Sequence, residues 1–288
     1  MTAEIIDGKK IAGKIKKKVS KDVENLSKKH GFKPNIATIK IGDNKESNLY
    51  LKLRDKACEK VGIKSTHIEL NKDISENEVL EEIKILNSND KIHGVLIQMP
   101  VPSHISRNKL FEFLNPKKDV EGFTPYNMGR LLSGNQNIIP CTPLSVLKIL
   151  EHEKIDLKAK DVLIVNHSTV VGKPLCALFL NRNSSVSVAH IFTKNLEMYS
   201  KKADILVSAA GVKNLIKKEH VKPGSFVIDV GIIKTKTGVT GDVDFKSVKE
   251  LAGKITPVPG GAGPVTVACS LFNMVETFSR VVKNNKCK

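Results

Sequence analysis

The sequence has no tryptophan, and aromatic residues make up only 5% of its 288 residues. Its five cysteines, at positions 58, 141, 176, 269 and 287, form no CxxC pair, which argues against a disulfide framework and a structural zinc site. No stretch resembles a membrane helix of about 18 to 20 apolar residues, and the lysine-rich start lacks an apolar signal core. We therefore expect a cytoplasmic protein that has no membrane partner and no bound metal.

Negative charge is scarce, because 30 acidic residues stand against 47 lysines and arginines, for a net charge of +17. A nucleic acid is one partner that such a charge could attract. The basic residues are scattered, however, and no basic stripe carries interleaved aromatic side chains. A lysine-rich composition of the whole proteome also accounts for the charge, and so does a smaller anionic ligand, such as a phosphorylated cofactor or a polyacid substrate. We expect no nucleic-acid partner.

Apolar strands alternate with amphipathic helices along the first half of the chain. Predicted strands cover residues 35–42, 65–70 and 93–100, and predicted helices cover residues 47–61, 75–87 and 106–115. The second of these helices begins with a capping box, because Ser75 is followed three residues later by Glu78. The continuous apolar run of the third strand is typical of a parallel sheet.

The second half of the chain repeats this alternation. Predicted strands cover residues 161–166, 185–192, 203–211 and 225–232, and predicted helices cover residues 172–183 and 263–283. A connector at 138–153 enters a further helix, with Thr142 as its N-cap and Pro143 at its first position. Such alternation implies βαβ crossovers and parallel sheets. We predict an α/β protein of two domains: residues 1–140 with the C-terminal helix 266–288, and a Rossmann-type domain over residues 141–265.

The strand, turn and helix of "DVLIVNHSTVVGKPLCALFL" have the layout of a dinucleotide-binding βα unit. The glycine fingerprint of such units is absent, because Gly172 is the only glycine in this stretch. Asn166, His167 and Ser168 stand at the exit of the strand. His167 is either an ordinary loop residue or a partial cation that contacts a phosphate.

A second segment, "TPVPGGAGPVTVA" at 256–268, opens directly into a helix. Gly260, Gly261 and Gly263 would let the backbone approach a ligand closely, and the start of the helix offers free N–H groups. The alternative is a tight loop that crosses between domains.

Tyr50 and Arg54, in "NLYLKLRDKACEKVGI", are four residues apart and share one face of a helix. A tyrosine beside a cation suggests a group that handles protons, but arginine does not release its proton in proteins whereas a buried lysine can. The pair is therefore an active site, an altered active site or only part of a charged helix.

The chain as a whole resembles the methylenetetrahydrofolate dehydrogenase/cyclohydrolase family. The resemblance is carried in order by "YLKLRDKACEKVGI", "GVLIQMPVPSHI", "PKKDVEGFTPYNMGRL", "PCTPLSVLKIL", "HSTVVGKP", "ADILVSAAG", "VIDVGI", "GDVDF" and "TPVPGGAGPVTVA". It implies oxidation of methylene-tetrahydrofolate by NADP, with NAD as an alternative, and hydrolysis of the methenyl product to formyl-tetrahydrofolate. It also implies a cleft between the domains, a homodimer, a polyglutamylated folate substrate and a place in one-carbon metabolism and purine biosynthesis.

The resemblance assigns roles to particular residues. The residues it makes catalytic are Tyr50, Arg54, Gln98 and Glu121. The residues it places on the folate are Tyr50, Gln98, Asp119, Glu121 and Pro264. The residues it places on the cofactor are Thr142, Asn166, His167, Ser168 and Ile232. No residue is assigned to a metal.

Three positions depart from the family pattern. Arg54 replaces the catalytic lysine, Glu121 replaces an aspartate, and "NHS" at 166–168 replaces "GRS". A general acid–base group contributes about 10² to 10⁴-fold to a rate, so we expect the cyclohydrolase step to be slowed by about that much. Glu121 is a candidate compensating change that shifts the ring or supplies a carboxylate for water.

The same departures leave other functions open. A dehydrogenase without cyclohydrolase activity is the nearest alternative, and an RNA-binding protein on a retired enzyme fold is a more distant one. Loss of the "GRS" arginine is expected to weaken the preference for NADP, although Lys173 could still help.

Overall fold

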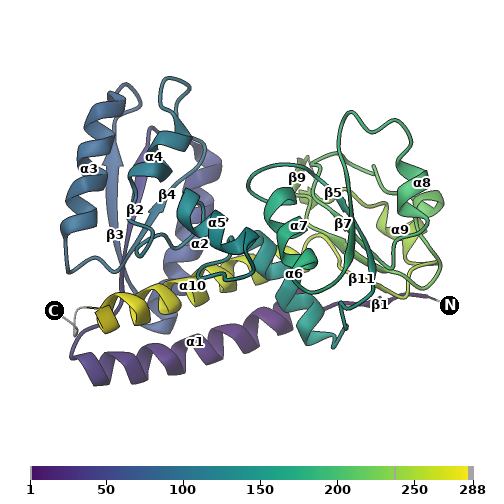
Figure 1. Ribbon diagram of the computed structural model, residues 1–288, viewed down its shortest axis with the longest axis horizontal. Helices are drawn as coiled ribbons and strands as arrows, with labels where there is room; N and C mark the ends of the chain where they lie inside the picture. The colour runs from purple at the N-terminus through teal and green to yellow at the C-terminus, as the bar shows by residue number, and fades with distance from the viewer. Residues whose placement is uncertain (1, 237, 285–288) are drawn as a thin grey trace. The chain divides into compact units, whose positions relative to one another are not determined.

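A computed structural model describes residues 2–236 and 238–284, apart from the side chains of residues 45–47, 49, 50 and 284. The chain forms two compact units (Figure 1). Unit 1 comprises Met1–Gly13, Leu131–Asn135 and Pro140–Thr266, and unit 2 comprises Lys14–Arg130, Gln136–Ile139 and Val267–Lys288. The N-terminal residues join unit 1 because their short strand β1 (Glu4–Ile5) pairs with the sheet of that unit.

Unit 2 is built on a three-stranded parallel sheet in the order β3-β2-β4. The strands are β2 (Asn35–Ile41), β3 (Lys64–Leu70) and β4 (Gly94–Ile97). The helices that follow them are α2 (Lys45–Val61), α3 (Glu76–Ser88), α4 (Arg107–Phe113) and α5 (Pro125–Leu132). Apolar side chains of α3 and α4 form a core on one face of the sheet, and those of α2 form a second core on the other. Both faces of the central strand are therefore covered, as its buried residues require.

Unit 1 contains a six-stranded, wholly parallel sheet in the order β1-β11-β8-β7-β5-β6. Its other strands are β5 (Asp161–Val165), β6 (Ser185–Ala189), β7 (Ile205–Ser208), β8 (Phe226–Asp229) and β11 (Lys254–Ile255). A separate antiparallel hairpin joins β9 (Ile233–Thr235) to β10 (Gly238–Thr240). The helices are α6 (Cys141–His152), α7 (Gly172–Leu180), α8 (Leu196–Ser200), the 3₁₀ helix η1 (Lys218–His220) and α9 (Phe245–Val248).

The order of strands places a switch point in unit 1. From β5 the chain moves outward to β6 and then returns to β7 on the opposite side of β5. Ligands of open α/β sheets bind at such a point, outside the carboxyl ends of the strands. The turn after β5 is therefore placed where a dinucleotide would be expected.

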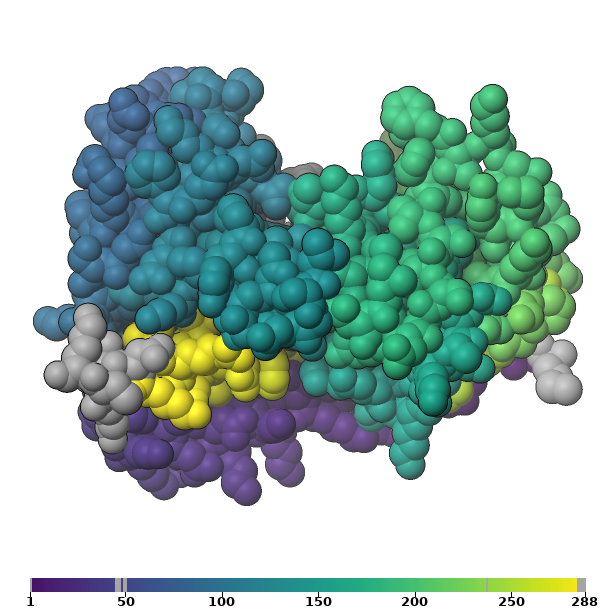
Figure 2. Space-filling view, viewed as in Figure 1, coloured from purple at the N-terminus to yellow at the C-terminus, as the bar shows by residue number. Residues whose placement is uncertain are grey.

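Two long helices, α1 (Gly8–His30) and α10 (Ala262–Asn284), complete the core of unit 2. Val19 and Val23 of α1 pack with Leu271, Met274 and Phe278 of α10. Figure 2 shows α10 as a narrow yellow band between the purple atoms of α1 and the blue atoms of unit 2. By length and composition α10 could cross a membrane, which the sequence analysis did not foresee, but 67% of its apolar stretch is buried in the protein. Its apolar character is explained by its place in the core.

The predicted α/β class and the predicted strands and helices are confirmed. The capping box of α3 is also present, because Ser75 N donates to Glu78 Oε2 at 2.9 Å and Glu78 N donates to Ser75 Oγ at 3.3 Å. The prediction that Thr142 caps α6 is wrong: the helix begins two residues earlier than predicted, at Cys141, and its N-cap is Pro140, which supplies no side-chain hydrogen bond. Of the cysteines in the described residues, Cys58, Cys141 and Cys269 are buried and Cys176 is half-buried, and none of these four forms a disulfide.

Candidate functional site

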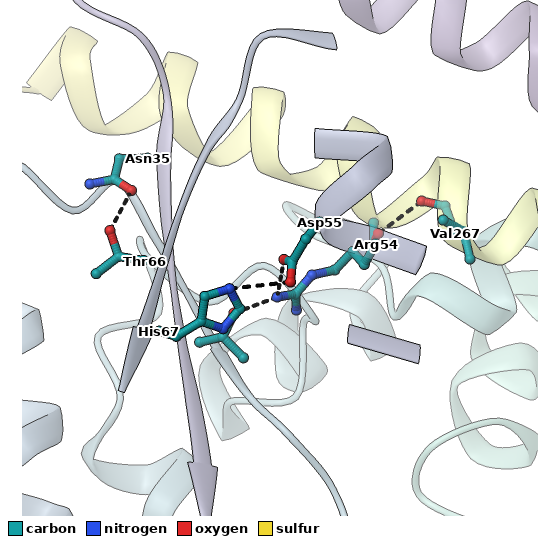
Figure 3. A network of polar contacts seen from close by, with 8 residues as sticks. Asn35, Arg54, Asp55, Thr66, His67 and Val267 are labelled. Carbon is teal, nitrogen blue, oxygen red and sulfur yellow. Dashed lines mark hydrogen bonds and ion pairs between the residues drawn. The ribbon is translucent and has the colours of Figure 1, made fainter. Parts of the chain in front are cut away.

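Arg54 lies on the face of α2 that packs on the sheet of unit 2, and only 1% of its surface is exposed. Its Nη2 donates to Thr38 Oγ1 of β2 at 2.5 Å and lies 3.4 Å from Asp55 Oδ1. Asp55 in turn pairs with His67 Nε2 of β3 at 3.2 Å, so a chain of polar contacts leads from Arg54 to a partly exposed histidine (Figure 3). These contacts hold one edge of the guanidinium group in place.

The other edge of the Arg54 guanidinium group is left unused. Its Nε and Nη1 atoms are buried and have no hydrogen-bond partner among the side chains that the structure describes. A buried charged donor without a partner costs more than about 1 to 3 kcal/mol, so such atoms are normally paired. Arg54 is therefore suited to bind a carbonyl or a carboxylate from a ligand.

Asp119 organises the loop that follows β4 in space. The backbone of Asp119 forms a parallel bridge with Val95 of β4. The carboxylate of Asp119 accepts four hydrogen bonds. The donors are Glu121 N at 3.0 Å, Gly122 N at 2.8 Å, Thr124 N at 2.8 Å and Asn127 Nδ2 at 2.9 Å. Because Asp119 is fully buried and both its oxygens are engaged, the structure gives it a positioning role. Its predicted contact with the substrate stays a prediction.

Glu121 is held at the end of this loop. The residue is half-buried, but its Oε2 atom is shut off from solvent and has no partner among the described side chains. The pKa of Glu121 is raised to about 8, mainly by burial and in addition by the nearby Asp119 carboxylate. The guanidinium groups of Arg54 and Arg107 act in the opposite direction. Near neutral pH this carboxyl group can therefore exist in both protonation states.

Arg107 was not found from the sequence. It is the first residue of α4, and its guanidinium carbon lies 5.4 Å from the ring centre of Phe111 and 5.1 Å from that of Phe123. This arrangement holds a second fixed cation close enough to affect Glu121. No local pattern links position 107 to position 121, so only the fold brings the two together.

Gln98 follows β4, and its backbone N–H donates to Ile39 O at 2.8 Å. Its Nε2 donates to Met99 O at 2.8 Å, whereas its Oε1 is buried without a partner. Strand register explains why Gln98 and Arg54 are brought together. Thr38, which holds Arg54, pairs with Leu96, and Gln98 stands two residues further along. Side chains two residues apart share one face of a sheet.

Unit 2 therefore brings Arg54 close to Glu121 and places Gln98 on the same face of its sheet as Thr38, and each of Arg54, Gln98 and Glu121 has a buried polar atom left for a ligand. The helix positions of Tyr50 and Arg54 agree with the predicted one-turn spacing. The side chain of Tyr50 lies outside the described part of the structure, so its predicted contacts with substrate stay a prediction.

The turn after β5 in unit 1 is organised by Asn166. Its Oδ1 accepts from Ser168 N at 2.7 Å and from Gly172 N at 3.0 Å, and its Nδ2 donates to Ala209 O beyond β7 at 2.6 Å. Gly172 begins α7 against this turn, where an added Cβ would lie 2.1 Å from Asn166 O. One glycine thus provides the close packing of helix and strand that Rossmann turns require.

A cavity of about 480 Å³ opens beside this turn. Its walls include Asn166, His167 and Ser168 after β5, His190 after β6 and Ala210 after β7. The rings of His167 and His190 lie 4.7 Å apart, and no lysine or arginine lines the cavity within the described residues. The structure thus brings three of the predicted cofactor residues together. Thr142 in α6 and Ile232 after β8 do not line this cavity, and their roles stay predictions.

Two buried aspartates that the sequence analysis did not single out hold the strand ends of unit 1. Asp229 of β8 accepts from the backbone N–H groups of Gly231, Asp242 and Val243 at 2.9–3.1 Å. Burial raises the pKa of Asp229 to about 6. Asp242 accepts from Ser208 Oγ and from the backbone of Ala210 and Val212 at 2.6–3.0 Å. The signal was present in "VIDVGI" and "GDVDF", where a glycine follows Asp229 two residues later and another directly precedes Asp242.

The glycine-rich segment at 256–268 is a tight loop that leads into α10. An added Cβ on Gly8 would lie 1.9 Å from Gly261 O, so these two backbones are packed against each other. Gly8 is thus required for this packing, and so is Gly261, since its own Cβ would lie 2.5 Å from Pro257 O, whereas a Cβ on Gly263 would meet no atom within 4 Å. Pro264 lies in the first turn of α10, and its predicted contact with substrate stays a prediction.

Within the described residues, no group of three or more His, Cys, Asp or Glu side chains could hold a metal ion.

A Rossmann-type turn beside a cavity, in a chain that also carries a buried acid and cation site, defines the class of two-domain, dinucleotide-dependent enzymes. The family model for the tetrahydrofolate dehydrogenase/cyclohydrolase catalytic domain matches residues 6–121, and the model for its NAD(P)-binding domain matches residues 140–282. The chain belongs to this family.

Relatives of known sequence and structure agree with this assignment. Bifunctional protein FolD of Methanosarcina mazei is 49% identical over 266 residues, which are 92% of this chain and 93% of that protein. The crystal structure of the bifunctional enzyme from Campylobacter jejuni has a TM-score of 0.94 at 43% identity, covering 96% of this chain and 99% of that one. The Trypanosoma brucei enzyme, solved with NADP and an inhibitor, has a TM-score of 0.93 at 32% identity, covering 98% and 99%.

Proposed function

We propose that this protein oxidises methylene-tetrahydrofolate with a nicotinamide dinucleotide and hydrolyses the methenyl product to formyl-tetrahydrofolate. The observation that carries the proposal is the set of buried, unpartnered polar atoms on Arg54, Gln98 and Glu121, in a chain that matches both domains of the family. The alternative of a dehydrogenase without cyclohydrolase activity is not favoured, because relatives at 43–49% identity are named as bifunctional. No relative cited above is named as an RNA-binding protein, so that function is not proposed.

The residues of unit 2 can bind different polar groups of the folate. The unused edge of Arg54 donates hydrogen bonds, and the oxygens of Gln98 and Glu121 accept them, so a heterocycle with both kinds of group fits. Asp119 keeps Glu121 in position through their shared loop. The Rossmann-type turn and cavity of unit 1 fit a dinucleotide, with His167 and Ser168 at its phosphates or ribose. When bound, the cofactor supplies the oxidant for the methylene carbon.

A direct test is to mix the purified protein with methylene-tetrahydrofolate and either NADP or NAD. Formation of reduced dinucleotide that requires both the protein and the folate is the expected result. Absence of reduction with either dinucleotide would contradict the proposed dehydrogenase function.

The turn at Gly172 provides a test of the cofactor site. Gly172→Ala is expected to raise the KM for the dinucleotide at least tenfold, because its methyl group would lie 2.1 Å from Asn166 O and force the turn to open. A tenfold change corresponds to about 1.4 kcal/mol, within the usual cost of overpacking. Gly13→Ala in α1 is the matched control, since its Cβ would meet no atom within 4 Å. Equal KM values for the two variants would argue against a dinucleotide at this turn.

NADP is the cofactor we propose, with NAD as a substitute. The NADP complex of the Trypanosoma brucei enzyme supports this choice. The preference for NADP over NAD is expected to be weak, because His167 and His190 stand where a fixed cation would bind the extra phosphate. His167→Arg is expected to raise the ratio of NADP to NAD efficiency at least tenfold, because arginine is always charged and binds phosphate with two donors. The control is His152→Arg in α6, outside the cavity. An unchanged ratio in His167→Arg would place the extra phosphate elsewhere.

The remaining expectations are also proposals. A homodimer, a cytoplasmic location and a role in purine biosynthesis are supported by the family resemblance of the sequence. A polyglutamylated folate is supported in addition by the net charge of +17, because its tail carries several carboxylates. The same charge leaves the proposed absence of nucleic-acid and membrane partners to be tested by binding at physiological salt.

A further inference from the structure

We propose that Glu121 moves the proton in the cyclohydrolase step of this chain, in place of the family lysine at position 54, with Arg54 as its fixed cationic partner. The inference rests on the proposed function and extends it. It starts from a contradiction: hydrolysis needs a group that accepts and returns a proton, and Arg54 cannot do so under protein conditions.

Arg54 is built as a fixed donor. Its guanidinium group is buried and held by Thr38 at 2.5 Å, and Asp55 lies beside it. The two substitutes that α2 could offer, Lys52 and Lys56, are exposed on another side of the helix. Neither of these lysines is placed to replace the missing one.

Glu121 has the placement that a proton carrier needs. Its Oε2 atom is buried and unpartnered, whereas the neighbouring Asp119 has both oxygens committed to four donors. Of the two acids in the loop, only Glu121 thus has an oxygen available to a water molecule. The charged groups that act on it are Asp119 from its own loop, Arg54 from α2 and Arg107 from α4. Together they keep its carboxyl group able to lose and regain a proton near neutral pH.

The chemical step balances with this group alone. Water forms a C–O bond to the methenyl carbon, the electrons of the carbon–nitrogen double bond move to nitrogen, and the Glu121 carboxylate takes one proton from the water. One carbon–nitrogen bond of the hydroxylated product then breaks. The leaving nitrogen keeps the electron pair and takes the proton from Glu121, while the remaining O–H proton passes to solvent as the formyl C=O forms. The cationic substrate and water thus yield neutral formyl product and one proton.

The test compares Glu121→Gln in two backgrounds, the natural chain and Arg54→Lys. In the natural chain we expect the kcat of methenyl-folate hydrolysis to fall by about 10²-fold or more, because the proton carrier is lost. With lysine at position 54 the same change is expected to cost less than about tenfold, since lysine can carry the proton. An equal cost in both backgrounds, a cost in KM alone or no cost would overturn the proposal, because Glu121 would then only bind the substrate or do nothing.

A pH profile and a conservative variant distinguish loss of proton transfer from loss of structure. Below a pH of about 8 the natural chain should lose cyclohydrolase kcat/KM as the pH falls, since Glu121 becomes protonated, and Glu121→Gln should lose that dependence. Glu121→Asp, which keeps a carboxyl group, should recover at least a tenth of the natural rate. Glu112→Gln, an exposed change in α4, is the control and should alter neither reaction. Dehydrogenase activity in the natural chain separates failure of this inference from failure of the proposed function.

Discussion

Arg54→Lys is expected to raise the rate of methenyl-folate hydrolysis by about tenfold, because it adds a second group that can exchange a proton beside Glu121, which already carries one. The site already provides what a lysine there would need. Position 54 is buried, Thr38 offers a hydrogen-bond acceptor, and the shorter side chain fits within the space of the longer one. Burial should lower the pKa of the new ammonium group toward neutrality, as it does for lysines in general.

The measurement is steady-state hydrolysis of methenyl-tetrahydrofolate by the natural protein and the variant, with the uncatalysed rate subtracted. Lys56→Arg makes the reverse exchange on the exposed side of the same helix and should leave the rate unchanged. No gain in Arg54→Lys would show that the arginine does not limit this step. Dehydrogenase activity should change much less, since alignment rather than proton transfer governs that reaction.

Asp119→Asn is expected to destabilise the protein by about 3 kcal/mol and to lower both activities. The carboxylate accepts four hydrogen bonds at 2.8–3.0 Å in a fully buried position. An amide has one oxygen to offer, and its NH₂ group would face N–H donors, so at least two donors lose their acceptor at about 1 to 3 kcal/mol each. The loop that holds Glu121 would lose its anchor at the same time.

Chemical denaturation of the two proteins would measure this loss. Asp156→Asn is a matched control, because Asp156 also accepts a backbone hydrogen bond, from Lys158 N at 3.0 Å, but is exposed to water. It should change the free energy of unfolding by less than about 0.5 kcal/mol. If Asp119→Asn behaved like this control, the four hydrogen bonds would not be what holds the loop.

Regular secondary structure was predictable where its period was clear. The buried strand β4 and the capped helix α3 have strong local signals, and both are present. Helix α1 was not predicted, although Ile11, Val19 and Val23 recur at helical spacing, because the many lysines between them leave only a narrow apolar stripe. The two-residue strands β1 and β11 are defined by their pairing in the sheet, β1 with β11 and β11 with β8, so no local pattern could reveal them.

The candidate site was predictable in its residues but not in its contacts. The resemblance supplied Arg54, Gln98 and Glu121, and the fold brings them together. The hydrogen bond from Arg54 to Thr38 spans 16 positions, and the influence of Arg107 on Glu121 spans two elements. Such contacts depend on strand register and burial, which a single sequence does not specify. For the same reason the four donors to Asp119 were not foreseen, and its assignment to the substrate stays a prediction.

The claim that one protein performs both reactions is tested most directly by following the methenyl intermediate during turnover. The purified protein is mixed with methylene-tetrahydrofolate and NADP, and reduced dinucleotide, methenyl-folate and formyl-folate are measured together over time. We predict that formyl-folate accumulates in step with reduced dinucleotide, well above the uncatalysed rate of hydrolysis. If methenyl-folate instead accumulated in equal amount to the reduced dinucleotide and decayed only at the uncatalysed rate, the account of a bifunctional enzyme would be contradicted.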